Sequence, residues 1–251
     1  MTPRKAILAA VCIIMVVCCC AGESRPDLIR SAKNITSEDQ VGEWLTYYYL
    51  HPRPDLLISA LRLMSKDEWF KKGDGQTPVS AFLAQVFLAN PDRLGGWASD
   101  IASDPEDEKS AMTVALWMAN DETCRQTLAT VAKGGGPGFQ EKVRVFSAKQ
   151  PPNLLKDEIT SPQFLDALWA SFFATGDERY VWRLISALPM VDTKGDVSKM
   201  LIGGAAQWSL TSNAIQHGRV MEICEAQLNT LPDDQKPALK KVIDSAREKR
   251  K

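Results

Sequence analysis

The 251-residue sequence predicts an all-α protein, and three observations lead to that class. Apolar residues recur with the 3.6-residue period of a helix, as at positions 79, 82, 83, 86 and 87. Proline repeatedly follows a polar residue, for example at Ser161-Pro162, where its fixed φ suits the first turn of a helix. No segment alternates apolar and polar residues for the length of a strand, because Val143-Arg144-Val145 is too short. We expect about ten helices of roughly 10 to 20 residues each.

The first 21 residues have the composition of an export signal. Arg4 and Lys5 form a short basic start, an apolar run continues to Val17, and the small residue Ala21 closes the segment. The stretch 6–21 has 16 residues and would be about 24 Å long as a helix. A helix that crosses a bilayer needs roughly 20 residues. We therefore expect a signal that is removed. An uncleaved anchor and a buried N-terminal helix are the alternatives.

Three consecutive cysteines near the end of this signal are candidates for lipid attachment. The run Val16-Val17-Cys18-Cys19 resembles a bacterial lipobox, although it lacks the usual Leu at −3 and the Gly or Ala at −1. The candidate lipidation sites are Cys19 and Cys20. A signal-peptidase cut after Ala21 is the alternative. The protein is thus expected to be exported, either periplasmic or lipid-anchored in the cell envelope, or else secreted.

Behind the signal, residues 22–36 are expected to form a tether, and residues 37–251 a single all-helical domain. Ser37 and Gln40 have the spacing of a capping box, in which the two side chains exchange hydrogen bonds with amides of the first turn. Further helix starts are predicted where a polar residue precedes proline, at Arg53-Pro54, Thr77-Pro78, Asn90-Pro91 and Asp104-Pro105.

The predicted helices end in a recurring corner: an aromatic residue, a small residue, a polar turn and a new helix. The clearest copies begin at Phe87, Trp117 and Phe173, and looser ones at Tyr49 and Phe146. Successive aromatics are 38, 30, 29 and 27 residues apart, about the length of two helices with two short turns. The three clear copies predict equivalent buried aromatics, each holding the end of one helix against the next hairpin.

This pattern resembles a degenerate tetratricopeptide-like, or other α–α hairpin, repeat array across most of residues 37–230. It departs from that family in its variable period and in lacking the ordered Trp, Leu-Gly and Tyr positions, so no functional residue follows from it. The resemblance implies antiparallel helical hairpins stacked as an α–α superhelix. A compact multi-helix bundle is the alternative architecture.

Glycines interrupt the predicted helices at two places, with different consequences. Residues 133–138 contain four glycines and a proline, so we expect a flexible loop or hinge there. Gly203 and Gly204 lie inside an apparent helix, where they are expected to permit close approach by a neighbouring element.

Composition and charge exclude several kinds of site. Thirty basic and 31 acidic residues give a net charge of −1, which argues against a broad nucleic-acid-binding face. His51 and His217 have no ligand partner at helical spacing, so the sequence predicts no metal site, and it shows no cofactor or catalytic motif. Outside the signal only Cys124 and Cys224 remain, and both are expected to be buried free thiols.

The run Tyr47-Tyr48-Tyr49 is the one aromatic cluster with a functional interpretation. Successive residues of a helix point about 100° apart, so the three rings cannot all face one core. We therefore take Tyr47 and Tyr48 as candidate contacts to a partner.

The first functional hypothesis is a non-catalytic, exported and membrane-anchored protein that binds a protein or peptide on its helical surface. The second is a cell-envelope hydrolase or glycan lyase on the same scaffold, and the third is a carrier for an apolar ligand. A deep pocket with a desolvated carboxylate would favour the enzyme. A shallow, aromatic-lined groove would favour the binding protein.

Overall fold

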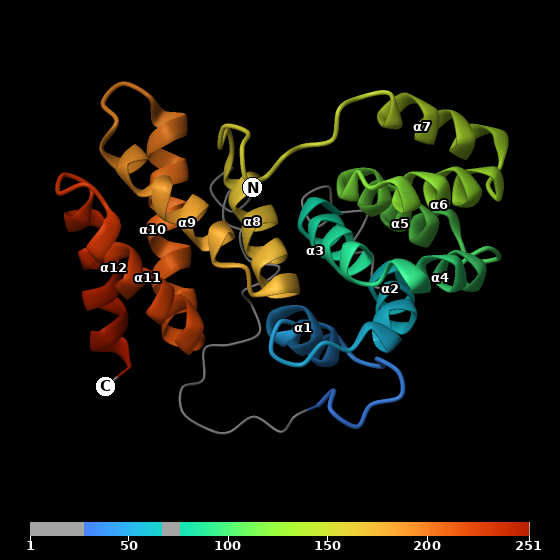
Figure 1. The fold of residues 1–251 in the computed structure, drawn as a ribbon, viewed down its shortest axis with the longest axis horizontal. Helices are drawn as coiled ribbons and strands as arrows, with labels where there is room; N and C mark the ends of the chain where they lie inside the picture. The colour runs from blue at the N-terminus through green and yellow to red at the C-terminus, as the bar shows by residue number, and fades with distance from the viewer. Residues whose placement is uncertain (1–27, 67–75, 251) are drawn as a thin grey trace, which may run out of the picture. The chain divides into compact units, whose positions relative to one another are not determined.

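A computed structural model describes residues 28–66 and 76–250, and over these residues the predicted all-α class is confirmed (Figure 1). The described chain contains twelve α-helices and three short 3-10 helices, and no strand. The expected signal, with Cys19 and Cys20, lies outside the described residues. Among the helices described, none is both long and apolar enough to cross a bilayer.

Contacts divide the chain into two compact units, which we describe separately. The first unit ends at Pro152 and also includes Phe173–Gly176; the second comprises Asn153–Phe172 and Asp177–Lys251. Helices of the first unit are α1 (Glu38–Tyr47), η2 (Pro54–Leu56), α2 (Leu57–Lys66), α3 (Gln76–Ala89), η3 (Pro91–Arg93), α4 (Leu94–Asp100), α5 (Glu106–Ala119), α6 (Glu122–Lys133) and α7 (Pro137–Ser147).

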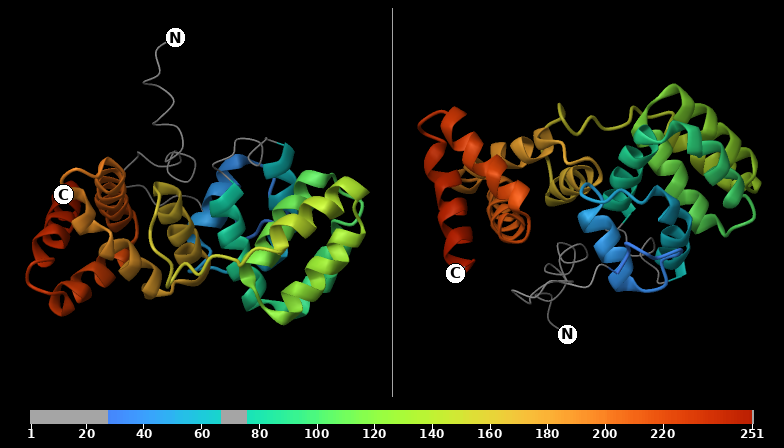
Figure 2. Two further views of the ribbon diagram at one scale, coloured as in Figure 1. Left: turned by 90° about the horizontal axis from the view of Figure 1, so that it is seen from above. Right: turned by 60° about the horizontal axis from the view of Figure 1, so that its bottom comes forward.

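Helices of the first unit contact their next-but-one neighbours: α3 packs on α5, α4 on α6, and α5 on α7. Consecutive helices α5 and α6, and α6 and α7, also pack together, and Figure 2 shows α5 to α7 side by side. A stack of helical hairpins produces this neighbour pattern, because each helix contacts its equivalent in the next hairpin. The pattern supports the predicted hairpins, and their continuation into a superhelix stays a prediction.

The second unit is organised around one long helix. Its elements are α8 (Pro162–Thr175), whose last residues belong to the first unit, α9 (Glu178–Ser186), η4 (Leu188–Asp192), α10 (Val197–Gln216), α11 (Gly218–Thr230) and α12 (Lys236–Lys249). Helix α10 contacts α9, η4, α11 and α12. Helix α10 approaches η4 closely at Gly203, where an added Cβ would lie 2.1 Å from the backbone nitrogen of Val191. The close approach expected from glycine is therefore confirmed at Gly203, with η4 as the neighbour.

Most predicted helix starts agree with the structure to within two residues. Pro54, Pro91 and Pro162 are the first residues of η2, η3 and α8, whereas Pro105 is the N-cap of α5. The capping interaction at the start of α1 differs in one bond. Ser37 Oγ accepts from the Gln40 N–H as expected, at 3.3 Å, but the Gln40 side chain accepts from the N–H of Thr36.

The predicted apolar stripes form the core of both units. Phe82, Leu83 and Phe87 of α3 are at most 1% exposed, and Val181 and Leu184 of α9 are fully buried. Phe82 of α3 contacts the ring of Trp44 in α1 and the ring of Tyr48, the C-cap of α1. These contacts hold α1 against α3.

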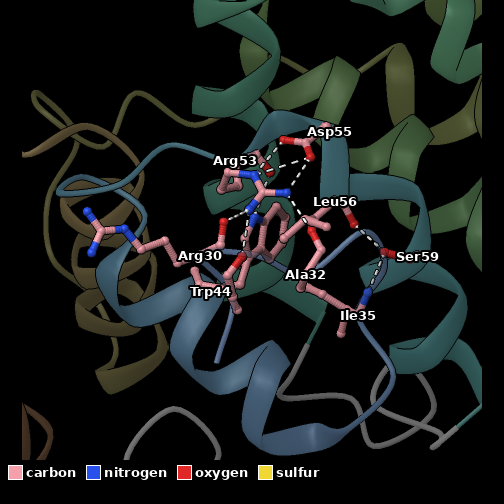
Figure 3. A network of polar contacts seen from close by, with 9 residues as sticks. Arg30, Ala32, Ile35, Trp44, Arg53, Asp55, Leu56 and Ser59 are labelled. Carbon is pink, nitrogen blue, oxygen red and sulfur yellow. Dashed lines mark hydrogen bonds and ion pairs between the residues drawn. The ribbon is translucent and has the colours of Figure 1, made fainter. Parts of the chain in front are cut away.

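Residues 28–36, expected as a tether, belong to the first unit, with Ile29 and Ile35 buried. Figure 3 shows Arg30, Ala32 and Ile35 of this segment close to Arg53 and Ser59. The Arg53 guanidinium donates to the carbonyl oxygens of Ile29, Arg30 and Ala32 at 2.6–2.8 Å, and its own carbonyl accepts from the indole of Trp44. A guanidinium fork has enough donors to satisfy several carbonyls at once, which explains the attachment of a segment without periodicity.

Candidate functional site

An open groove of about 400 Å³ lies between α6 and α7 in the first unit. Buried Leu128 and Val143 line its apolar part, together with the small side chains of Ala129 and Ala132. Trp117, at the end of α5, also lines the groove. The groove is therefore open, with apolar residues from both helices and one aromatic ring in its lining.

The glycine-rich segment sets the spacing of the two helices that line this groove. Helix α6 ends with Gly134 as its C-cap, and α7 begins at Pro137 with Gly136 as its N-cap. The segment expected to be a flexible loop over residues 133–138 is therefore a tight turn of three residues, Gly134–Gly136. An added Cβ at Gly135 would lie 2.2 Å from the buried ring of Phe139, so glycine permits this close packing.

Two arginines line the groove from opposite helices. Arg125 of α6 donates to Glu122 at 2.8 Å and to the backbone carbonyl of Asn120 at 3.0 Å. Arg144 of α7 donates to both carboxylate oxygens of Glu141, at 2.6 and 2.7 Å. Their side chains are 52% and 73% exposed, so both guanidinium groups are accessible to a partner carboxylate.

Trp117 connects the end of α5 to the end of α7. Its indole N–H donates to the carbonyl of Lys149 at 3.0 Å, and its ring meets the edge of Phe146 at a centroid distance of 5.8 Å. Trp117 is half-buried, whereas Phe87 and Phe173 are 0% and 3% exposed. The prediction of three equivalent buried aromatics is thus wrong for Trp117, because part of its ring faces the groove.

A second, smaller groove of about 290 Å³ lies on the opposite face of α6, towards α4. It is lined by hydroxyl and small side chains, and the hydroxyls of Ser99, Thr127 and Thr130 donate to carbonyls of their own helices. Because those protons are already engaged, the hydroxyl oxygens can only accept hydrogen bonds from a ligand. No aromatic ring lines this groove.

The predicted tyrosine contacts do not line either groove. Tyr48 is 3% exposed, packs against Trp44 and Phe82, and burial raises its phenol pKa to about 12. It is a core residue, so the structure corrects the expectation of a partner contact at Tyr48. Tyr47 is half-buried, and a partner contact there stays a prediction.

The sequence did not single out Arg125, Arg144 or the groove function of Trp117. Residues 125, 128, 129 and 132 share one face of α6, and that spacing was the available signal. It could not indicate a groove, because a face that combines one leucine with small and basic residues is ordinary on any surface helix.

His217, Cys124 and Cys224 are buried. Burial lowers the pKa of His217 to about 4 and raises the thiol pKa of Cys124 to about 11 and of Cys224 to about 12. Both thiols are free, as expected. In the part of the chain that the structure describes, no three His, Cys, Asp or Glu side chains converge as metal ligands.

Glu108, in the first turn of α5, is the residue that bears on the enzyme hypothesis. It is 5% exposed, and its Oε2 atom has no hydrogen-bond partner. The side chain lines neither of the two grooves. A desolvated carboxylate is therefore present, but outside the concave surfaces described above.

Comparison with known proteins adds no relative to these observations: no family model, no curated protein and no solved structure matches the chain.

Proposed function

We propose that the chain is an exported protein, held at the membrane by a lipid on Cys19 or Cys20, that binds a peptide segment of a partner protein in the α6–α7 groove. The observation that carries the proposal is the arrangement of the groove itself. An apolar lining formed by Leu128 and Val143 lies between two exposed arginines that belong to different helices. Grooves of this kind accommodate apolar anchor side chains while charged groups at their edges select the partner.

The chemistry of the lining specifies the partner segment. One or two apolar side chains would occupy the space above Leu128, Ala129 and Val143, and acidic side chains beside them would meet Arg125 and Arg144. The arginines now pair with Glu122 and Glu141 in solvent-exposed i,i+3 pairs, and such surface ion pairs contribute little to stability. A partner carboxylate can replace such a contact at small cost.

Site-specific photo-crosslinking in the native host tests the groove. A benzoylphenylalanine at Ala129, an exposed position lining the groove, should capture a discrete partner. The same group at Lys142, exposed on the opposite face of α7, should not. Charge reversal by Arg125→Glu with Arg144→Glu should abolish the product, and Arg219→Glu, a similarly exposed and ion-paired arginine, should preserve it. Equal capture from positions 129 and 142 would refute the proposal.

Intact mass of the protein recovered from its host tests the membrane part. Removal of the residues before Cys19 or Cys20, with an added diacylglycerol, is the expected result. A mass that retains Met1 to Val17 would contradict export by a cleaved signal. A chain that begins at Gly22 and carries no lipid would indicate that the protein is exported in free form and is not anchored.

A cell-envelope hydrolase or lyase is the second candidate, and Glu108 is the observation that favours it. Its Oε2 atom is buried without a hydrogen-bond partner among the described residues, and such an unsatisfied buried polar atom can mark a catalytic position. Loss of envelope-degrading activity in Glu108→Gln, with an unchanged urea melt, would support this candidate. Lack of such activity in the unaltered protein would remove it.

A further inference from the structure

Helix α10 exposes an apolar stripe to solvent. Val197 is 70% exposed, Leu201 58%, Trp208 48% and Met200 45%. These are large fractions for apolar side chains on one helix, and α10 carries a single charged residue, Lys199, over its 20 residues. Contiguous exposed apolar surface of this kind marks an interaction site.

The stripe has the spacing of a coiled-coil contact face. Six residues on the face that contains Val197, Leu201 and Trp208 follow one another at alternating intervals of four and three residues; they are Val197, Leu201, Gly204, Trp208, Thr211 and Ile215, and Met200 lies outside this repeat. This alternation is the a/d repeat that lets one helix pack along another. We call these six residues the α10 seam. The opposite face of α10, which includes Ile202, Ala206 and Leu210, is buried against the rest of the second unit.

Two neighbouring positions of the seam have complementary shapes. At Gly204 an added Cβ would meet no atom within 4 Å, so the backbone is open to a neighbour. One turn later, Trp208 projects the largest side chain of the seam. A helix that presents a hole and a knob on the same face is self-complementary in an antiparallel pair, because each knob then lies opposite the other copy's hole.

We propose that the α10 seam is the interface of a symmetric dimer, in which α10 packs antiparallel to α10 of a second copy. Trp208 lies over Gly204 of the partner subunit, and Leu201 lies beside Thr211 of the partner subunit. Val197 lies beside Ile215 of the partner subunit. A parallel pair would place the two tryptophans against each other and leave the two glycine holes unfilled, so the side-chain sizes favour the antiparallel arrangement.

Exposed apolar surface and charge also suit a second copy. A dimer would cover the exposed apolar side chains Val197, Leu201 and Trp208, together with the neighbouring Met200, which are 45–70% exposed. Lys199 does not belong to the seam, and no other charge of α10 would have to be desolvated. A tryptophan at the centre of the contact is the residue type that most often dominates binding free energy.

Sedimentation equilibrium of the full chain tests the dimer by exchanging the knob and the hole. Trp208→Gly removes the knob, and Gly204→Trp fills the hole, so each single variant should weaken dimerisation at least tenfold. The double variant places the knob at position 204 and the hole at position 208. Because the symmetric pairing is then preserved, it should recover most of the lost affinity.

Trp182→Ala is the matched control, since Trp182 is also an exposed tryptophan of the second unit, at 38%, and lies outside the seam. It should leave the dimerisation constant unchanged. A wild-type chain that stays monomeric at about 100 micromolar would overturn the proposal. So would a dimer that survives both single variants, or one that depends on residues 1–27 and not on Trp208, because another surface would then form the contact.

Discussion

Asn120 and Gly176 occupy the same place in two helical corners. Each lies three residues after the corner aromatic, Trp117 or Phe173, and each has a positive φ, of 49° and 70°. In both corners the next residue is an aspartate that caps the following helix: Asp121 accepts from the N–H of Thr123, and Asp177 accepts from the N–H of Arg179. Two segments related only by a faint sequence pattern thus share one backbone geometry.

The shared geometry predicts opposite effects of two substitutions at these corners. Gly176→Ala should lower the free energy of unfolding by about 1–2 kcal/mol, because an alanine at positive φ is strained. Asn120→Gly should be neutral or slightly stabilising, since glycine adopts the same φ without strain. Urea melts of both variants would check this. A loss of stability in Asn120→Gly would show that the Asn120 side chain, which accepts from Arg125, matters more than its backbone.

The corner aromatics should not contribute equally to stability. Phe87→Ala and Phe173→Ala each remove a buried ring and should cost about 3–5 kcal/mol. Trp117→Ala should cost less, about 1–2 kcal/mol, because the half-buried indole loses one hydrogen bond and part of its packing. Urea melts compare the three variants, with Glu178→Ala expected to change stability by less than about 0.5 kcal/mol. Equal losses of unfolding free energy in all three variants would mean that the three corner aromatics contribute equally, contrary to this prediction.

The helices and their apolar faces were predictable because local signals determine them. Proline at the first turn, the Ser37 cap and the 3.6-residue stripes of α3 and α9 act within a few residues. The attachment of residues 28–36 was not predictable, since it depends on Arg53, which is distant in sequence and has no periodic signature. The α6–α7 groove was missed for a related reason: its arginines and Trp117 converge only once three helices have packed.

The adjacent glycines of α10 should respond differently to alanine. Gly203→Ala places a Cβ 2.1 Å from the nitrogen of Val191 and 2.7 Å from the carbonyl carbon of Met190, and should cost about 1–3 kcal/mol. Gly204→Ala meets no neighbouring atom and should stabilise the helix by about 1 kcal/mol. Thermal melts at low protein concentration, where association does not contribute, would measure both. Equal effects would mean that η4 can move away from α10.

His217 should make the free energy of unfolding depend on pH. Its pKa is lowered to about 4 by burial, against about 6.5 in an unfolded chain, so the unfolded state binds more protons between these values. Stability should therefore fall by about 3 kcal/mol as pH decreases from about 7 to 4. In His217→Gln this part of the slope should disappear, whereas His51→Gln, at an exposed position, should retain it. Urea melts at several pH values measure the slopes, and identical slopes in all three proteins would contradict a buried neutral imidazole.

The contacts of residues 28–36 would limit how far the protein stands from a membrane if the proposed lipid is present. If the lipid is on Cys20, only eight residue steps separate the anchor from Leu28, where the chain joins the first unit. Fully extended, eight steps reach about 28 Å, so the bilayer surface and the α1–α2 region stay within roughly 3 nm of each other. Any pull on the anchor would first load the hydrogen bonds that Leu28 makes with Glu43 and Gln40 of α1. It would then load the Arg53 guanidinium, which holds the carbonyls of residues 29, 30 and 32. Glu43, Gln40 and Arg53 would then together form the mechanical joint between the anchor and the first unit.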